Sequence, residues 1–143
     1  DRRVAPVIYV WGIFGGILAL AHPGMDPFKF PHFSNTFFYF YHIAILMAAY
    51  VVFKEHRAYI LKCKKQVRLF TLFFNLSLYV INLGLHSNYG YMVKSPIFAD
   101  KFSGMTFYFL IAIFVYDLLV QIIYKITDIK YGDDVNMEDV GVE

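Results

Sequence analysis

Polar residues with acid, base and hydrogen-bonding chemistry recur inside long apolar stretches of this chain. His42 lies near the middle of one such stretch. Two further stretches carry polar residues at helical spacing: Asn75, Tyr79, Asn82 and His86 in one, and Asp117, Gln121 and Tyr124 in the other. Polar side chains in membrane helices face a bundle interior or a water-filled cavity, because facing lipid is costly. These residues are therefore candidates for lining one polar pocket.

The functional interpretation of this pocket is acid–base chemistry beside a lipid headgroup, an ester carbonyl or a proton path. His42 can act as a general acid or base, with a carboxylate such as Asp117 tuning it. Asn82 and Tyr79 can then stabilise an oxyanion. His42 lies more than about 10 Å below the outer boundary, so we expect it to be neutral and hydrogen-bonded to another helix. Tyr79 is its expected nearest polar neighbour, with Asn82 bordering the same cavity.

The structural interpretation is that these groups only hold helices together, at about 0.6 kcal/mol for each hydrogen-bonded pair. This interpretation fits Asn75 and Gln121 better than a functional one. Both interpretations stay open for His42 and Asn82. Asp117 is near the inner end of its stretch, so we expect its carboxylate to reach the interface.

Motifs for metal or cofactor chemistry are not found. His22 and His32 share a loop, but no third ligand stands at a useful spacing. The chain has no Walker motif, no G-x-G-x-x-G and no nucleophile elbow. We therefore expect no metal, no cofactor and no nucleic-acid partner; membrane lipids are the expected partner.

Four apolar runs must position the polar residues, at about residues 4–21, 33–53, 69–85 and 105–124. Each is close to the ~20 residues that a spanning helix needs. Hydrophobic residues make up 59% of the 143 residues and charged residues only 17%, where a soluble domain carries about 25% charge. Because lipid cannot satisfy exposed peptide groups, the runs must be helical. The sequence predicts an all-α, polytopic transmembrane bundle with four spanning helices.

The 13 lysines and arginines indicate the orientation of the bundle. Placing both termini and the second loop inside puts these bases on the cytoplasmic side: Arg2, Arg3, Lys54, Arg57, Lys62, Lys64, Lys65, Arg68, Lys125 and Lys130. The outer side then holds only Lys29, Lys94 and Lys101. We predict an N-in, C-in protein of the cell membrane. The basic second loop is foremost a topology determinant, and binding of anionic headgroups is the alternative.

The chain divides into a transmembrane region, 1–124, and an acidic cytoplasmic tail, 125–143, with little fold of its own. Gly12 and Gly16 form a G-x-x-x-G, which we interpret as close packing within the chain more than dimerisation. Cys63 lies in the basic loop, where we expect an unmodified thiol. The chain opens on Asp1, so we expect a piece of a longer protein.

Several short motifs, in order, resemble one known family. They are Tyr9-Val10-Trp11-Gly12-Ile13, Ala19-Leu20-Ala21-His22-Pro23, Phe37-Phe38-Tyr39-Phe40-Tyr41-His42, Asn82 with Asn88-Tyr89-Gly90-Tyr91, Lys94-Ser95-Pro96, and Tyr108. Together they resemble the YwaF-like integral membrane proteins, whose eukaryotic branch includes transmembrane phospholipid acyltransferases. The resemblance runs to about Tyr124 and covers only the C-terminal part of the family pattern.

This resemblance implies further helices before the present chain, with a His-x-Cys element that resembles a catalytic site. Cys63 does not match that element and does not inherit its role. The resemblance implies that this chain holds the supporting part of a site. This part would be lined by His42, Asn82, Asn88 and Tyr89. With Tyr79 added from the polar spacing, His42 is the candidate catalytic residue and Tyr79, Asn82, Asn88 and Tyr89 are the candidate lipid-binding residues.

Three functions remain open from the sequence. The first is lipid or acyl handling through a polar pocket within the membrane. The second is a non-enzymatic subunit that docks other membrane or cytoplasmic subunits, which the basic inner loop and acidic tail would suit. The third is a transporter or channel component with His42 lining a pathway, although no inverted repeat is visible.

Overall fold

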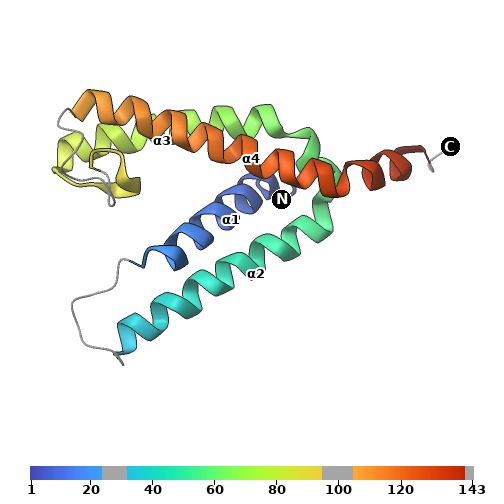
Figure 1. Ribbon diagram of the computed structural model, residues 1–143, viewed down its shortest axis with the longest axis horizontal. Coiled ribbons are helices and arrows are strands. Elements are labelled where there is room, and N and C mark those ends of the chain that lie inside the picture. The colour runs from blue at the N-terminus through green and yellow to red at the C-terminus, as the bar shows by residue number, and fades with distance from the viewer. Residues whose placement is uncertain (24–31, 95–104, 141–143) are drawn as a thin grey trace. The chain divides into compact units, whose positions relative to one another are not determined.

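A computed structural model describes residues 1–23, 32–94 and 105–140 of the chain. These residues form four α-helices and one short 3-10 helix, with no strand among them (Figure 1). The elements are α1 (Ala5–Ala21), α2 (Phe33–Lys62), α3 (Lys64–Leu85), η1 (Tyr89–Tyr91) and α4 (Met105–Val140). The predicted all-helical fold is confirmed.

The helices have the length and composition of membrane spans. α2, α3 and the segment Phe107–Gly132 of α4 are each long and apolar enough to cross a bilayer. α1 is apolar but has 17 residues, which gives about 25 Å against a hydrocarbon core of about 30 Å. The chain is therefore a multi-pass membrane protein, with three clear spans and one shorter apolar helix.

The chain folds as two compact units, which are described separately. Unit 1 comprises Asp1–Lys64 with Ile126–Glu143, and unit 2 comprises Lys65–Lys125. Unit 1 thus contains α1, α2 and the last part of α4, while unit 2 contains α3, η1 and the first part of α4.

Small residues let α1 and α2 of unit 1 pack closely as an antiparallel pair (Figure 1). A Cβ atom added to Gly12 would lie 2.8 Å from the Cβ of Ala49, and one added to Gly16 would lie 2.6 Å from Leu46 Cγ. The Cβ of Ala49 cannot move away, so Gly12 is required by the approach of α2, whereas a side chain at position 16 would require Leu46 to change its conformation. The G-x-x-x-G therefore serves packing within the chain, as expected.

Aromatic residues connect the end of α4 to the same pair of helices in unit 1. The Tyr9 ring stacks on Phe53 with centroids 4.7 Å apart, and Phe53 also contacts Tyr131 at 5.1 Å. The hydroxyl groups of Tyr9 and Thr127 are hydrogen-bonded at 2.8 Å. Thr127 lies beyond the apolar run, so the segment after Lys125 takes part in the core of unit 1.

Two predicted boundaries are wrong. The second helix was expected to end at Phe53, before a basic loop that could form a short interfacial helix. Instead α2 continues through Lys62, with one non-helical residue at His56 (φ −129°, ψ 23°), and only Cys63 separates it from α3. α4 does not end near Tyr124 but continues to Val140. Lys, Arg, Glu and Ala are good helix formers, so hydropathy marks where lipid ends and not where a helix ends.

Cys63 is buried at this break, with 5% of its surface exposed. Several residues used in the sequence predictions lie outside the described residues, among them Lys29, Pro96 and Lys101. The predicted acidic tail is described as a helix through Val140, and its side on the membrane stays a prediction.

Unit 2 is built on the antiparallel helices α3 and α4. Tyr79 of α3 stacks on Phe109 of α4 with centroids 3.8 Å apart. Met92, from the segment after η1, is fully buried in a cluster with Tyr108, Phe109 and Ala112. These contacts hold one end of the pair together and leave the other end to polar residues.

Candidate functional site

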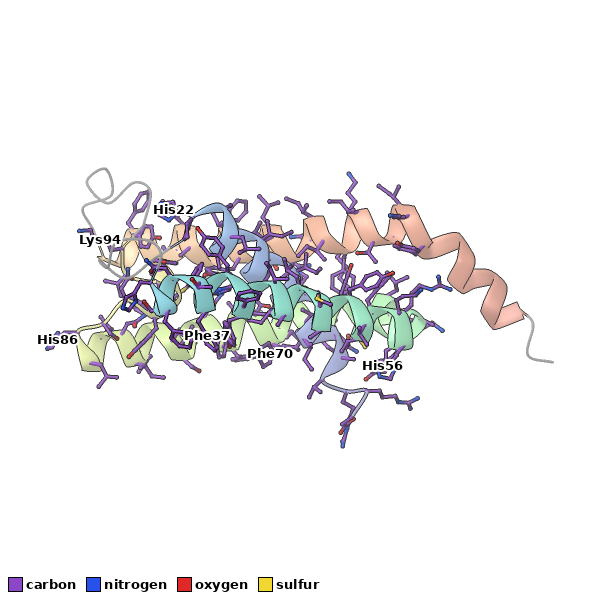
Figure 2. All side chains as sticks on the ribbon, turned by 90° about the horizontal axis from the view of Figure 1, so that it is seen from below. His22, Phe37, His56, Phe70, His86 and Lys94 are labelled. Carbon is purple, nitrogen blue, oxygen red and sulfur yellow. The ribbon has the colours of Figure 1, made fainter. Side chains whose placement is uncertain are left out.

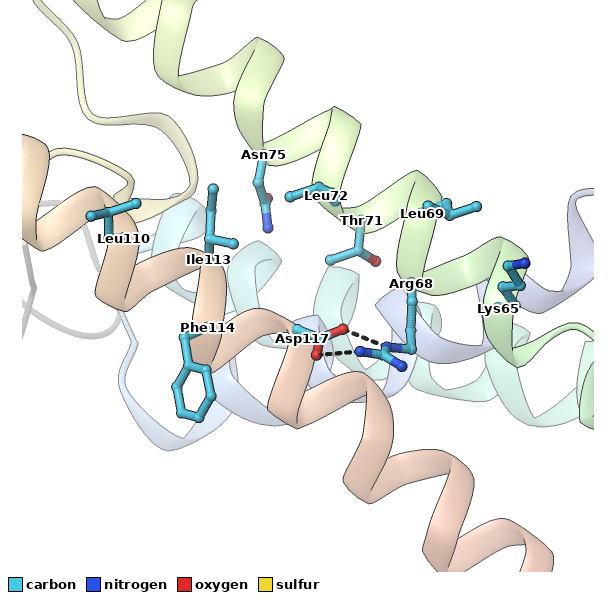
Figure 3. A pocket seen from close by; sticks show the side chains of 10 residues that line it. All are labelled: Lys65, Arg68, Leu69, Thr71, Leu72, Asn75, Leu110, Ile113, Phe114 and Asp117. Carbon is cyan, nitrogen blue, oxygen red and sulfur yellow. Dashed lines mark hydrogen bonds and ion pairs between the residues drawn. The ribbon is translucent and has the colours of Figure 1, made fainter.

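A cavity of about 460 Å³ lies between α3 and α4 within unit 2 (Figure 3). We call it the α3–α4 cavity. Its apolar walls are formed by Leu69, Leu72, Leu110, Ile113 and Phe114. Its polar lining consists of Lys65, Arg68, Thr71, Asn75 and Asp117.

Asn75 is the most informative residue of this cavity. Only 1% of its surface is exposed, and neither its Nδ2 nor its Oδ1 has a hydrogen-bond partner among the described residues. Figure 3 shows the side chain directed from α3 toward α4. A buried polar group without a partner costs about 1–3 kcal/mol. The fold therefore leaves a buried donor and a buried acceptor without a protein partner at the wall of the cavity, at a cost to its own stability.

An ion pair stands at one end of the same cavity. Arg68 Nε donates to Asp117 Oδ1 at 2.6 Å and Arg68 Nη2 donates to Oδ2 at 2.9 Å, a two-point contact (Figure 3). Gln121 Nε2 also donates to Asp117 Oδ2 at 2.7 Å. The pair joins α3 to α4 and fixes the planes of both charged groups.

Asp117 was expected to reach the interface, and this stays a prediction. Its side chain is paired with Arg68 and is 31% exposed. Arg68 is 44% exposed, so the pair is half in contact with solvent or headgroups and adds little to stability in water. The pair places a fixed cation and a fixed acceptor at the polar end of an apolar cavity.

Such an arrangement fits an amphipathic ligand. The Leu, Ile and Phe walls can cover an apolar chain, and the amide of Asn75 can bind a carbonyl or hydroxyl group in that chain. Arg68 can reach an anionic group at the cavity end.

Asn82, predicted to bind lipid, is used by the protein itself. It is 2% exposed. Its Oδ1 accepts from Tyr89 N at 2.7 Å and from Ser87 Oγ at 2.8 Å, and its Nδ2 donates to Tyr89 O at 2.9 Å. The amide therefore holds the chain that leaves α3.

Asn88 also binds backbone groups of the segment that follows α3. Its Oδ1 accepts from Val93 N and Lys94 N, both at 3.0 Å, and its Nδ2 donates to Lys94 O at 2.9 Å. Tyr116 donates its hydroxyl to Gly90 O at 2.9 Å. We call residues 86–94 the clamped loop.

The backbone of the clamped loop is strained. His86, Gly90 and Tyr91 have φ of 49°, 63° and 53°, and positive φ is costly for residues other than glycine. A Cβ on Gly90 would also lie 3.1 Å from Leu78 Cδ1. The structure thus brings Asn82, Asn88 and Tyr89 together, as expected, but the two amides bind backbone groups.

His42 and Tyr79 belong to different units, so their predicted proximity stays a prediction. The hydrogen bond of His42 runs from Nδ1 to Phe38 O at 2.8 Å, on its own helix and not on another one. Its ring contacts those of Phe38 and Tyr41, with centroids 4.2 and 5.3 Å away. Figure 2 shows all the described side chains, with Phe37 and His56 labelled toward opposite ends of α2.

Arg68 was not predicted to belong to the candidate site, and Asn75 was placed among the structural amides. A signal was present, because Arg68, Thr71 and Asn75 follow i, i+3 and i+7 and so continue the polar face of α3. Arg68 was counted only among the bases that indicate the orientation of the bundle, because it lies at the edge of the third apolar run. Asn75 and Asn82 were predicted to face protein, and their burial confirms this.

The fold and this site define a multi-pass helical membrane protein with a polar cavity between two spans. A sequence model of the TMEM164 family matches residues 1–127, and the chain belongs to this transmembrane protein family. Comparison with the curated proteins and with the solved structures gives no significant match. The YwaF-like resemblance and the match to only a C-terminal part of the family pattern stay predictions.

Proposed function

We propose that the protein handles a lipid or acyl group, which it binds in the α3–α4 cavity. The observation that carries this proposal is the Asn75 amide, buried and without a partner in a cavity of about 460 Å³. Cavities of this size accommodate small ligands. In a protein surrounded by lipid, the most abundant amphipathic molecule is the lipid itself.

The lining of the cavity supports a chain that carries an ester or amide. Asn75 Nδ2 can donate to its carbonyl, while Leu72, Leu110 and Ile113 contact the methylene groups. Arg68 stands where the headgroup end of such a ligand would lie. Buried apolar contacts would supply most of the affinity, and Asn75 would fix the position of the ester along the cavity.

Acid–base catalysis by His42 is a separate proposal. A carbonyl oxygen can only accept, so the bond to Phe38 O assigns the proton to Nδ1. In neutral imidazole this leaves Nε2 unprotonated and able to act as a base. His42→Gln keeps a hydrogen-bonding amide and removes this chemistry. If that variant assembles and works as well as the parent, His42 is structural.

Native mass spectrometry of the detergent-purified chain tests lipid binding by Asn75. Asn75→Leu removes both hydrogen-bonding atoms and keeps similar volume. Because one neutral hydrogen bond contributes about 0.5–1.5 kcal/mol, we expect about a two- to tenfold loss of retained lipid. Ser77→Ala is the matched control, since Ser77 is exposed on α3 and donates to Phe73 O. Equal lipid retention by Asn75→Leu and Ser77→Ala would reject the proposal.

A further inference from the structure

A second hollow, of about 410 Å³, lies in unit 1 where α2 passes out of its apolar run. We call it the basic hollow. It is lined by Arg2, Lys54, Glu55, His56, Arg57 and Tyr59. Three basic side chains and one carboxylate therefore surround a space large enough for a small polar group.

The backbone explains why these cations gather. His56 is the one non-helical residue within α2, so the turn that carries Lys54 and Arg57 departs from a regular helix. Arg2 arrives from the far end of the sequence, ahead of α1. The hollow is thus formed by two segments that only the folding of unit 1 brings together.

Aromatic rings hold the three cations. The Arg2 guanidinium lies 5.4 Å from the centre of the Tyr59 ring, and that of Arg57 lies 5.9 Å from the Tyr131 ring. The Lys54 ammonium lies 5.9 Å from the Tyr50 ring. Cation–π contacts restrict the orientation of a cationic side chain.

The neighbouring bases are arranged differently. Arg3 forms an exposed ion pair with Asp1 at 2.7 Å, whereas Arg2 lines the hollow. Lys62 and Lys64 lie further along and do not line the hollow. A general excess of inner positive charge explains all of these bases equally, but it does not explain why three of them surround one space.

We propose that the basic hollow binds a phosphate monoester, carried by the headgroup of an anionic membrane lipid. The apolar run before Lys54 places the hollow at the membrane boundary, where headgroup phosphates lie. Guanidinium groups match the geometry of phosphate oxygens, and a monoester offers two negative charges to three cations. A free phosphate compound shares this chemistry and is the other source to test.

The test uses the full purified chain and native mass spectrometry with three ligands. They are short-chain phosphatidic acid, short-chain phosphatidylcholine and inorganic phosphate. Phosphatidic acid carries the monoester on a lipid, phosphatidylcholine carries a zwitterionic diester, and inorganic phosphate carries the anion without a lipid. Binding of phosphatidic acid well above both others is expected. Equal binding of inorganic phosphate would assign the hollow to a soluble ligand, which overturns the lipid source.

Two pairs of variants separate a site from diffuse attraction. Lys54→Gln with Arg57→Gln should weaken phosphatidic acid binding by at least about tenfold, because each loses a charge-assisted hydrogen bond. Lys62→Gln with Lys64→Gln removes the same charge outside the hollow and should cost less than about threefold. Arg2→Gln and Arg3→Gln repeat the comparison in the N-terminal segment, where substitution does not disturb a helix. Equal losses within each pair would overturn the proposal and leave the α3–α4 cavity unaffected.

Discussion

Three asparagine amides of unit 2 are used in opposite ways. Asn82 and Asn88 have their oxygens and nitrogens bound to backbone groups of the clamped loop, whereas Asn75 has neither atom bound among the described residues. A protein that needs an amide only for packing gives it partners, since an unpaired buried amide is costly. The exception at Asn75 marks the position where a ligand is expected.

The role of Asn82 predicts a large loss of stability on truncation. Asn82→Ala removes three hydrogen bonds and leaves the N–H and C=O of Tyr89 without their partner. We expect a cost of about 2–4 kcal/mol and faster proteolysis of the clamped loop. Ser87→Ala removes only one of these bonds and should cost about 1 kcal/mol. Equal stability of Asn82→Ala and the parent in thermal unfolding would contradict this assignment.

The helices show which of their bounds can be predicted from the apolar runs of a membrane protein. All four runs are helical, because lipid permits no other backbone structure there. Three helices begin within one residue of the expected position, and α3 begins at Lys64, five residues before its expected start. The expected C-terminal ends of α2 and α4 were wrong, since both helices continue into charged sequence. Because the last helix was expected to end near Tyr124, Thr127 and Tyr131 were not predicted to belong to the core of unit 1.

The pairing of α1 with α2 gives a test with a built-in control. Gly12→Ala places a Cβ 2.8 Å from that of Ala49, so the helices must separate. We expect a loss of about 1–3 kcal/mol in the free energy of unfolding. Gly15→Ala meets nothing within 4 Å and should be neutral or stabilising by up to about 1 kcal/mol, because alanine favours helix. Equal stability of the Gly12→Ala and Gly15→Ala proteins would contradict this prediction.

For the whole protein, the composition was sufficient to predict the class of fold but not the residues of the candidate site. The polar face of α3 was recognised from its spacing, and the burial of Asn75 and Asn82 follows from it. Spacing cannot tell whether an amide finds partners, because those of Asn82 come from a loop whose path depends on positive φ at three residues. The pairing of Arg68 with Asp117 depends on the register of two helices, which a single sequence does not specify.

The predicted orientation can be tested with single cysteines. Cys63 is itself 5% exposed and is a poor target for labelling. In a Cys63→Ser background, Lys94→Cys should react with an impermeant maleimide on intact cells, because the clamped loop is expected outside. Lys64→Cys should react only after permeabilisation. The reverse pattern would invert the topology.

The thermal stability of Asn75→Leu, measured with and without added lipid, tests most directly whether Asn75 is kept for a ligand. Leucine removes a buried amide that has no protein partner, so the lipid-free variant should unfold at a higher temperature than the parent, by about 1–3 kcal/mol in stability. Added phospholipid should then stabilise the parent more than the variant, because only the parent can bind the ester group. A variant that is less stable than the parent without lipid, and equally stabilised by it, would contradict this account.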